Sequence, residues 1–145
     1  MKTLTTQATI NSFTNQGNEN SIIHSAIAFI NQIDFYNECL YRELVDKIQA
    51  ALTEAIDNVV TFAYPNKQGK VCVSIFIYDK NVLKLKVRDW GRGIEDINKA
   101  RTPGFTSEKE DHAGIGFTVM ESFSDKLTVK STLGKGTIVT MEFQM

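Results

Sequence analysis

The chain has 145 residues, 42% hydrophobic and 23% charged, which are proportions typical of one globular domain with a substantial core. Sixteen basic residues against 17 acidic ones leave a formal net charge of −1, so the basic excess of a nucleic-acid or anionic-membrane binder is missing. We therefore expect a single domain over residues 1–145 that makes no direct contact with nucleic acid or membrane.

The first part of the chain predicts one strand followed by two helices. Residues 3–10 are rich in β-branched side chains with loose alternation, as in an edge strand. Residues 18–21 offer helix-start chemistry before a helical apolar period over residues 22–30. A longer helix is expected over about 37–64, ended by Pro65. Its apolar stripe comprises Leu40, Leu44, Ile48, Leu52, Ile56 and Val59.

The second part of the chain predicts two hairpins separated by short helices. We expect strands at residues 70–78 and 82–87, a short helix at 94–100, a polar loop at 102–113, a helix from Gly114, and strands at 126–132 and 137–143. Strands joined by hairpins run antiparallel. The predicted fold class is therefore α+β, a two-layer sandwich of a mostly antiparallel, mixed sheet with helices on one face.

The cysteines and the N-terminus bear on the compartment. Cys39 and Cys72 form no C-x-x-C pair, and the residues up to Gly17 lack the apolar segment of a signal peptide. No apolar run approaches the roughly 18 residues of a membrane span. These features predict a cytoplasmic protein with both thiols in its core. His24 and His112 lack metal-ligand spacing, so a structural zinc site is not expected.

Glu54 and Asn58 stand four residues apart in the long predicted helix, so both side chains emerge from one helical face. A carboxylate and a carboxamide beside the apolar stripe could hold a base and a metal ligand side by side. Taken alone, however, this spacing is more typical of a solvated helix edge.

Three glycine-containing segments follow. Residues 89–94, Asp-Trp-Gly-Arg-Gly-Ile, put an acid at a strand end that could accept a hydrogen bond from a ligand amine, although a tight turn also uses such glycines. Residues 113–117 put Gly114 and Gly116 at a predicted helix start, where backbone N–H groups suit phosphate oxygens. Residues 134–137, Gly-Lys-Gly-Thr, would by themselves be a hairpin turn. No parallel βαβ unit surrounds them, so a dinucleotide-binding fold fits poorly.

The order of these four motifs resembles the ATP-binding fold of gyrase and the histidine kinases, the GHKL superfamily with its Bergerat fold. The resemblance implies that ATP or ADP and Mg²⁺ bind, with Glu54 as general base toward an attacking serine and Asn58 as the Mg²⁺ ligand. Asp89 would bond the adenine amino group, assisted by Thr137. Residues 102–113 would be the lid. The further implied nucleotide contacts are Gly91, Gly93, Thr106, Ser107, Gly114, Ile115, Gly116 and Phe117.

Within that superfamily the chain resembles the small bacterial serine kinases that act as anti-sigma factors, above all the anti-sigma F factors of sporulation. The resemblance is carried by residues 100–106 and 114–121. It implies a homodimer that holds an RNA polymerase sigma factor and phosphorylates a serine of a STAS-type anti-anti-sigma protein. Two alternatives stay open: a nucleotide-gated binding module with weak or no kinase activity, and a switch serine kinase with a target other than a sigma factor.

Three positions depart from the pattern of that family. Ile23 stands where family members often carry an arginine, with His24 beside it. His112 and Ala113 replace the arginine often found before the second glycine box. After Asn58 the familiar His-Gly-Tyr becomes Phe62-Ala63-Tyr64.

Overall fold

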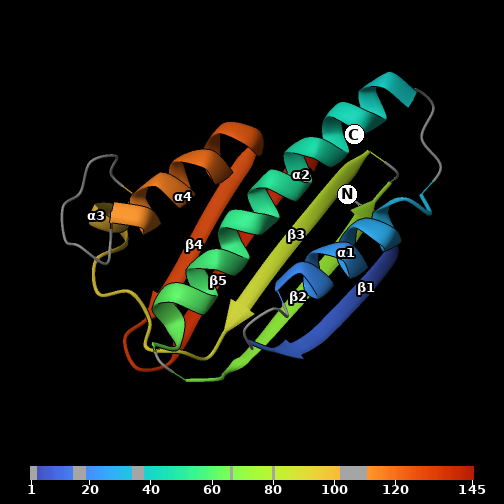
Figure 1. The fold of residues 1–145 in the computed structure, drawn as a ribbon. Coiled ribbons are helices and arrows are strands. Elements are labelled where there is room, and N and C mark those ends of the chain that lie inside the picture. Colours follow the sequence, from blue (N-terminus) through green and yellow to red (C-terminus); the bar gives the residue numbers. More distant parts are fainter. Residues whose placement is uncertain (1–2, 15–18, 34–37, 66, 80, 102–110) are drawn as a thin grey trace.

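In the computed structural model the described residues are 3–14, 19–33, 38–65, 67–79, 81–101 and 111–145. Its elements are β1 (Leu4–Phe13), α1 (Glu19–Ile30), α2 (Glu38–Asn58), the π-helix η1 (Val59–Ala63), β2 (Lys70–Tyr78), β3 (Val82–Asp89), α3 (Ile97–Arg101), α4 (Asp111–Phe123), β4 (Lys126–Thr132) and β5 (Gly136–Gln144). Figure 1 shows how they are arranged.

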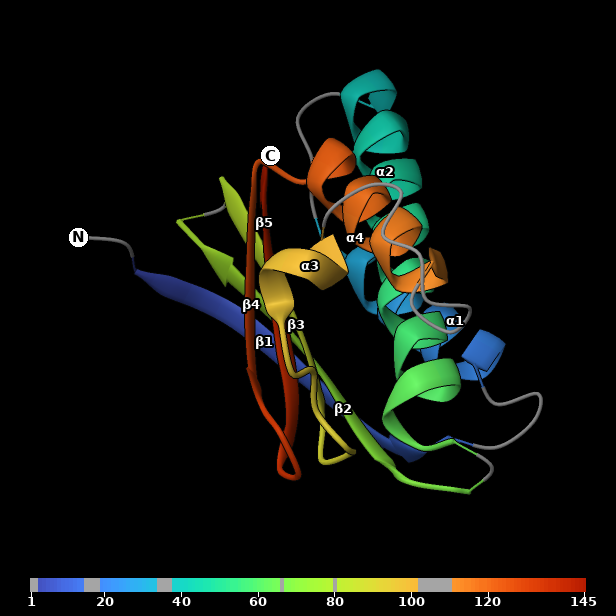
Figure 2. The same cartoon turned by 90° about the vertical axis from the view of Figure 1, so that its left-hand side faces the viewer.

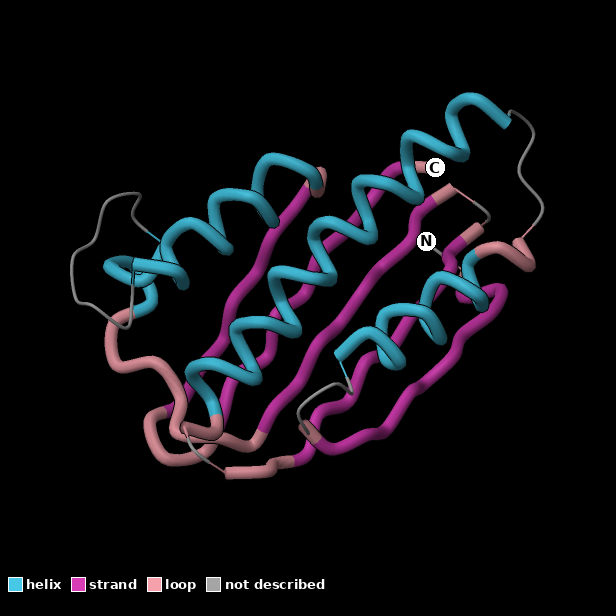
Figure 3. Tube along the Cα trace, in the orientation of Figure 1, coloured by secondary structure: helices cyan, strands magenta, loops and turns pink. Residues whose placement is uncertain are grey.

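One five-stranded sheet forms the base of the molecule, in the order β1-β2-β3-β5-β4. All four neighbouring pairs of strands are antiparallel, and β2–β3 and β4–β5 are hairpins. The strand β1 lies at one edge, as its sequence predicted. Figure 3 shows the strands lying side by side beneath the helices.

The helices cover one face of this sheet, so the molecule has two layers (Figure 2). The core lies between the layers because alternate residues of each strand face the helices. In β2 these are Val71, Val73, Ile75 and Ile77, all of them buried. The long helix α2 meets them with Ile48, Leu52 and Ile56, three residues of the predicted apolar stripe. The α+β two-layer prediction is confirmed, but the sheet expected to be mixed is antiparallel in every described strand pair.

The other face of the sheet carries charged and aromatic side chains. Lys84 lies over the ring of Tyr78, while Lys70 and Arg88 both lie against the ring of Trp90. The near-zero net charge thus conceals a local basic cluster. Cys72 belongs to this face and is half-buried, so its predicted core position is wrong. The side chain of Cys39 lies outside the described residues.

Three helix predictions needed correction at their ends. The short helix expected at 94–100 is α3, which begins at Ile97 and ends at Arg101. The predicted helix over 37–64 is α-helical to Asn58 and then continues as one π-helical turn, η1. The helix expected from Gly114 begins three residues earlier, at Asp111. Residues 102–110, most of the predicted lid, lie outside the described residues. Among the described helices, none is long and apolar enough to cross a membrane.

Candidate nucleotide-binding site

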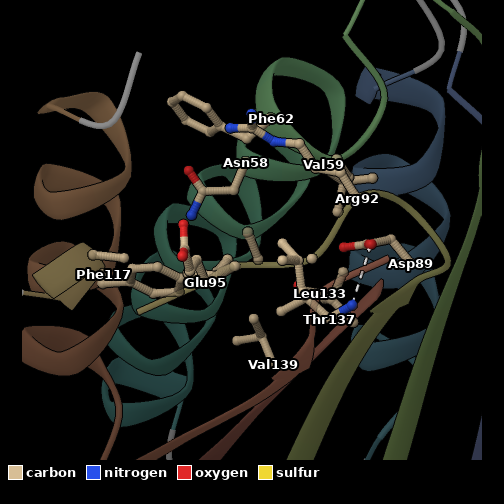
Figure 4. Close-up of a pocket in the computed structure, with 16 residues that line it drawn as sticks. Asn58, Val59, Phe62, Asp89, Arg92, Glu95, Phe117, Leu133, Thr137 and Val139 are labelled. Carbon is tan, nitrogen blue, oxygen red and sulfur yellow. Dashed lines mark hydrogen bonds between the residues drawn. The ribbon is translucent and has the colours of Figure 1, made fainter. Parts of the chain in front are cut away.

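A cavity opens between the end of α2, η1, α4 and the strands β3 and β5 (Figure 4). Of the site residues predicted from the sequence, those that line this cavity are Asn58, Asp89, Gly93, Phe117 and Thr137. They come from four separate parts of the sequence, and the fold brings them together around one space. The apolar side chains of Val59, Val87 and Val139 form part of its wall. Such a combination of apolar walls and few polar groups is typical of a small-molecule site.

Asp89 is the polar anchor at one end of the cavity. Its side chain is buried, and its Oδ1 accepts hydrogen bonds from the backbone N–H groups of Gly91 at 2.9 Å and Thr137 at 3.2 Å. Burial raises the pKa of this carboxyl, and the two backbone hydrogen bonds partly oppose that rise. No described residue donates to its Oδ2. That oxygen is therefore left to accept a hydrogen bond from a ligand.

Backbone hydrogen bonds hold the turn after Asp89 against its neighbours. The Trp90 N–H donates to the hydroxyl of Tyr64 at 2.8 Å, and the Arg92 N–H donates to the carbonyl of Ala63 at 3.0 Å. A Cβ at Gly91 would lie only 2.3 Å from that same carbonyl oxygen. Glycine at this position is therefore required for the turn to lie against η1.

Ser131 links this turn to the final hairpin. Its Oγ accepts a hydrogen bond from the Ile94 N–H at 2.7 Å and donates to the carbonyl of Gly136 at 3.0 Å. It also lies 2.7 Å from the hydroxyl oxygen of Thr137. One serine on β4 thus contacts two of the predicted glycine motifs at once.

Asn58 and Glu54 stand at the other end of the site, against the backbone of α4. A Cβ at Gly116 would lie 3.2 Å from Asn58 Oδ1 and 3.3 Å from Glu54 Oε2, so glycine leaves room for both side chains. The Asn58 Nδ2 is buried and has no hydrogen-bond partner in the part of the chain that the structure describes. This end is incomplete in the protein alone. Its amide and carboxylate oxygens are the kind of donor that Mg²⁺ accepts, so the residues fit that ion.

The second glycine segment lies inside α4 rather than at its start. Because α4 begins at Asp111, Gly114 lies within the first turn of the helix. Gly116 lies beyond that point and contributes space for Glu54 and Asn58 instead. Ile115 is 58% exposed, whereas Phe117 is buried and lines the cavity.

The fold therefore assembles most predicted site residues without placing every one on the cavity wall. Glu54 and Gly91 lie just behind that wall, in contact with Gly116 and Ala63 respectively. Thr106 and Ser107 lie outside the described residues.

Several residues of the site were not predicted from the sequence. Phe62, Glu95 and Leu133 line the cavity, and so does Arg92, for which the sequence left a ligand contact and a solvent-facing loop position equally open. Ser131 and Tyr64 lie behind the cavity wall and accept hydrogen bonds from the backbone of the turn after Asp89. A serine at an inward position of β4, among apolar neighbours, was the one available sequence signal for Ser131. Arg101 of α3 pairs with Glu121 of α4 at 3.5 Å, near the cavity but not in it.

Comparison with known proteins defines the class to which this fold and site belong. Residues 21–143 match the model of the histidine kinase-like ATPase domain. The chain therefore belongs to the histidine kinase-like ATPase domain family, the GHKL class of the sequence prediction.

Relatives within that class narrow the assignment. The chain is 47% identical over 100 residues to an anti-sigma F factor of Caldanaerobacter subterraneus subsp. tengcongensis, covering 68% of this chain and 69% of the relative. It is 39% identical over 127 residues to that of Geobacillus stearothermophilus, covering 86% and 83%. The chain belongs to the anti-sigma F factor family.

Solved structures of more distant relatives have the same fold. The chain matches the blue-light activated histidine kinase of Erythrobacter litoralis EL346 with a TM-score of 0.58 and 22% identity, covering 86% of this chain and 40% of the kinase. It matches the mycobacterial sensor histidine kinase MprB with a TM-score of 0.53 and 14% identity, covering 93% and 97%. At these identities the likeness concerns the fold alone.

Proposed function

We propose that this chain is a cytoplasmic, ATP-dependent anti-sigma factor and serine kinase. It would sequester an RNA polymerase sigma factor and phosphorylate a serine of a STAS-type anti-anti-sigma protein. The observation that carries the proposal is that polar groups stand at both ends of one cavity. At one end a carboxylate oxygen of Asp89 is open to a hydrogen bond from a nucleobase, and at the other end Asn58 lines the cavity with Glu54 just behind it. The anti-sigma F factors that resemble the chain support the choice of partner.

At the base end, Asp89 Oδ2 would accept a hydrogen bond from the exocyclic amine of adenine, and Thr137 would assist through its hydroxyl. The apolar wall around Val87 and Val139 would lie against the flat base. Burying a planar aromatic group against Val87 and Val139 adds affinity without a polar cost, because these aliphatic side chains carry no polar group that would be left unsatisfied.

At the phosphate end, Asn58 Oδ1 would coordinate Mg²⁺, which neutralises phosphate charge when it is bound. The backbone N–H groups at the start of α4, next to Gly114, would receive phosphate oxygens. Gly91 and Gly93 would let the backbone pass close to the nucleotide. Arg92 lines the same cavity and supplies a positive charge there.

For phosphoryl transfer the attacking group is the serine hydroxyl of the partner protein. Its oxygen bonds to the γ-phosphorus while the bond from that phosphorus to the β–γ bridging oxygen breaks, and ADP leaves with the electron pair. Glu54 takes the serine proton. Positioning supplies most of the catalysis in such reactions, so one carboxylate of this kind is sufficient as the base.

We also propose that the protein acts as a homodimer. The edge strand β1 supports this proposal because an outer strand edge presents backbone groups that can pair with a second chain. The position at which family members often carry an arginine is Ile23, which is buried here, whereas its neighbour His24 is exposed. Partner contacts in this region would therefore use His24.

The test is phosphotransfer from labelled ATP with Mg²⁺ and a candidate STAS protein. Labelled serine on that protein is expected, and Glu54→Gln should lower the rate by about 100-fold or more while nucleotide affinity is retained. Glu43→Gln is the matched control, since Glu43 lies on the same helix in an exposed pair with Lys47.

Other results of this test would contradict the kinase assignment or select one of the alternative functions. An absence of transfer, with Glu54→Ala behaving like the unmodified protein, would contradict the kinase assignment. If ATP binding and capture of a partner persisted, that result would select the nucleotide-gated binding module. Transfer without retention of a sigma subunit in a pull-down would instead select a switch kinase with another target.

A further inference from the structure

Ser131 contacts one of the two groups that face the proposed adenine amine, the hydroxyl of Thr137, although it does not itself line the cavity. It lies on β4, the edge strand farthest from β1, with its side chain half-buried on the helix side of the sheet. The inference below rests on the proposed nucleotide site and concerns which purine that site accepts.

The hydrogen bonds of Ser131 fix where its proton goes. A serine hydroxyl has one proton and two lone pairs. The Ile94 N–H can only donate to the Ser131 oxygen, and the Gly136 carbonyl can only accept from it. If the Ser131 proton is used for Gly136, one lone pair is left for the third neighbour, the Thr137 hydroxyl at 2.7 Å. Thr137 must then be the donor in that contact.

The opposite assignment is poorer. If Ser131 donated to Thr137, the hydrogen bond to the Gly136 carbonyl would be lost and one lone pair of Ser131 would have no partner. Buried polar groups that lose a partner carry an energetic cost. The arrangement with three hydrogen bonds is therefore the one that the geometry favours.

This arrangement makes Thr137 an acceptor toward the cavity. Its only hydroxyl proton is used for Ser131, while its backbone N–H is used for Asp89 Oδ1. Asp89 Oδ2, which no described donor reaches, is an acceptor as well. The base end of the cavity thus offers two acceptors to the 6-position of a purine. A 6-amino group has two protons to donate, whereas a 6-oxo group is itself an acceptor.

We infer that Ser131 is a positioning residue that holds the Thr137 hydroxyl as an acceptor and so sets the preference of the site for 6-amino over 6-oxo purine nucleotides. Replacing Ser131 by alanine frees the Thr137 proton. Thr137 can then turn and donate to a 6-oxo group, so discrimination weakens while the Asp89 carboxylate stays in place.

The test compares the dissociation constants of three nucleotides by titration calorimetry: ATP, inosine triphosphate, and purine riboside triphosphate, which has hydrogen at position 6. In Ser131→Ala the preference for ATP over inosine triphosphate should fall by about three- to tenfold, the equivalent of one hydrogen bond. Affinity for purine riboside triphosphate reports any general loosening of the site, because that nucleotide has no 6-substituent to recognise.

Three control variants separate positioning from a merely structural role. Ser131→Thr keeps the hydroxyl and should restore the preference. Thr132→Ala changes the neighbouring residue on the outer face of the same strand and should leave the preference unchanged. In a Thr137→Val background, Ser131→Ala should no longer alter the preference, because no hydroxyl remains to be reoriented.

Two outcomes would overturn the inference. One is an equal loss of affinity for all three nucleotides in Ser131→Ala, which indicates a structural effect on the Ile94 turn. The other is an unchanged preference with unchanged affinities. Either result, obtained with unmodified protein that binds ATP, leaves the proposed function intact. Failure of the unmodified protein to bind ATP would instead contradict the proposed function.

Discussion

The two ends of the cavity differ in how completely the protein satisfies its own polar groups. At the Asp89 end, Oδ1 has two backbone donors, and Ser131 connects the surrounding turns. At the Asn58 end, a buried amide nitrogen has no partner among the described residues. Hydrogen bonds within the protein therefore hold the Asp89 end in place, with Oδ2 left open to a ligand, whereas Asn58 Nδ2 is not held in this way.

This difference indicates how such a site divides its tasks. A nucleobase must be recognised by fixed donors and acceptors, which favours surroundings held rigid by hydrogen bonds within the protein. Phosphates and their metal ion bring charge and ligands of their own, so the protein can leave that end unsatisfied until they bind. The predictions below test each end separately.

The largest effect is expected at the rigid end from Gly136→Ala. The residue has φ of +120°, and an added Cβ would lie 2.2 Å from the Asp89 carbonyl oxygen, so strain and backbone movement should cost at least about 3 kcal/mol. Thermal unfolding should show the loss of stability, and ATP titration a loss of affinity. Gly134→Ala is the control, because its φ of +81° is also positive but nothing lies within 4 Å, so about 1 kcal/mol is expected and ATP binding should survive.

Asp89→Asn should weaken ATP binding by about ten- to a hundredfold. The two backbone N–H groups keep an oxygen at the Oδ1 position, so the new amide nitrogen takes the Oδ2 position. There it donates toward the adenine amine, which is also a donor, and a charge-assisted hydrogen bond is lost. Unchanged affinity in calorimetry would show that Asp89 does not face the base.

The same carboxyl makes nucleotide affinity depend on pH. Because burial raises the folded-state pKa of Asp89, its proton is gained at a higher pH than in the unfolded chain. ATP affinity should therefore fall as the pH drops through that raised pKa, while the ligand-free fold loses stability as the pH rises through it. Asp89→Asn should lack this component of both profiles, and equal profiles for the two proteins would contradict the assignment.

At the incomplete end, Asn58→Leu should raise the stability of the ligand-free protein and abolish Mg²⁺-dependent ATP binding. Removing a buried, unpaired amide relieves about 1 kcal/mol, which corresponds to a few degrees in the unfolding midpoint. Gln49→Leu, at an exposed position of the same helix, should bring no such gain. A destabilised Asn58→Leu protein would mean that the amide is satisfied in solution.

The smallest effect is expected from Tyr64→Phe, which tests how firmly the rigid end is held. The hydroxyl of Tyr64 accepts a hydrogen bond from the Trp90 N–H and donates to the Lys70 carbonyl at 2.6 Å. Its loss should weaken ATP binding by about three- to tenfold, as the Asp89 turn loosens. Tyr78→Phe, on the open face of the sheet, keeps its ring over Lys84 and should behave like the unmodified protein.

Local sequence patterns were sufficient for most of the fold. Alternation in β2 and the helical stripe of α2 identified the buried residues because burial follows the period of each element. The same alternation also places Cys72 on the opposite face of the strand from Val71 and Val73, outside the core. Cysteine usage alone did not indicate this position. Helix ends were less predictable. The helix α4 begins before its glycines, and Gly116 does not mark the helix start but leaves space for the side chains of Glu54 and Asn58.

The sequence by itself determined the kinds of chemistry available and the order in which the motifs occur, because both are properties of residue type and spacing. Only the tertiary structure decided which atoms remain unpaired. Whether Asp89 Oδ2 lacks a donor and Asn58 Nδ2 lacks an acceptor, and which way the Thr137 hydroxyl points, depends on residues up to 48 positions away in the chain. Hydrogen bonding is directional and short-ranged, so its balance is set by three-dimensional contacts that no local pattern encodes.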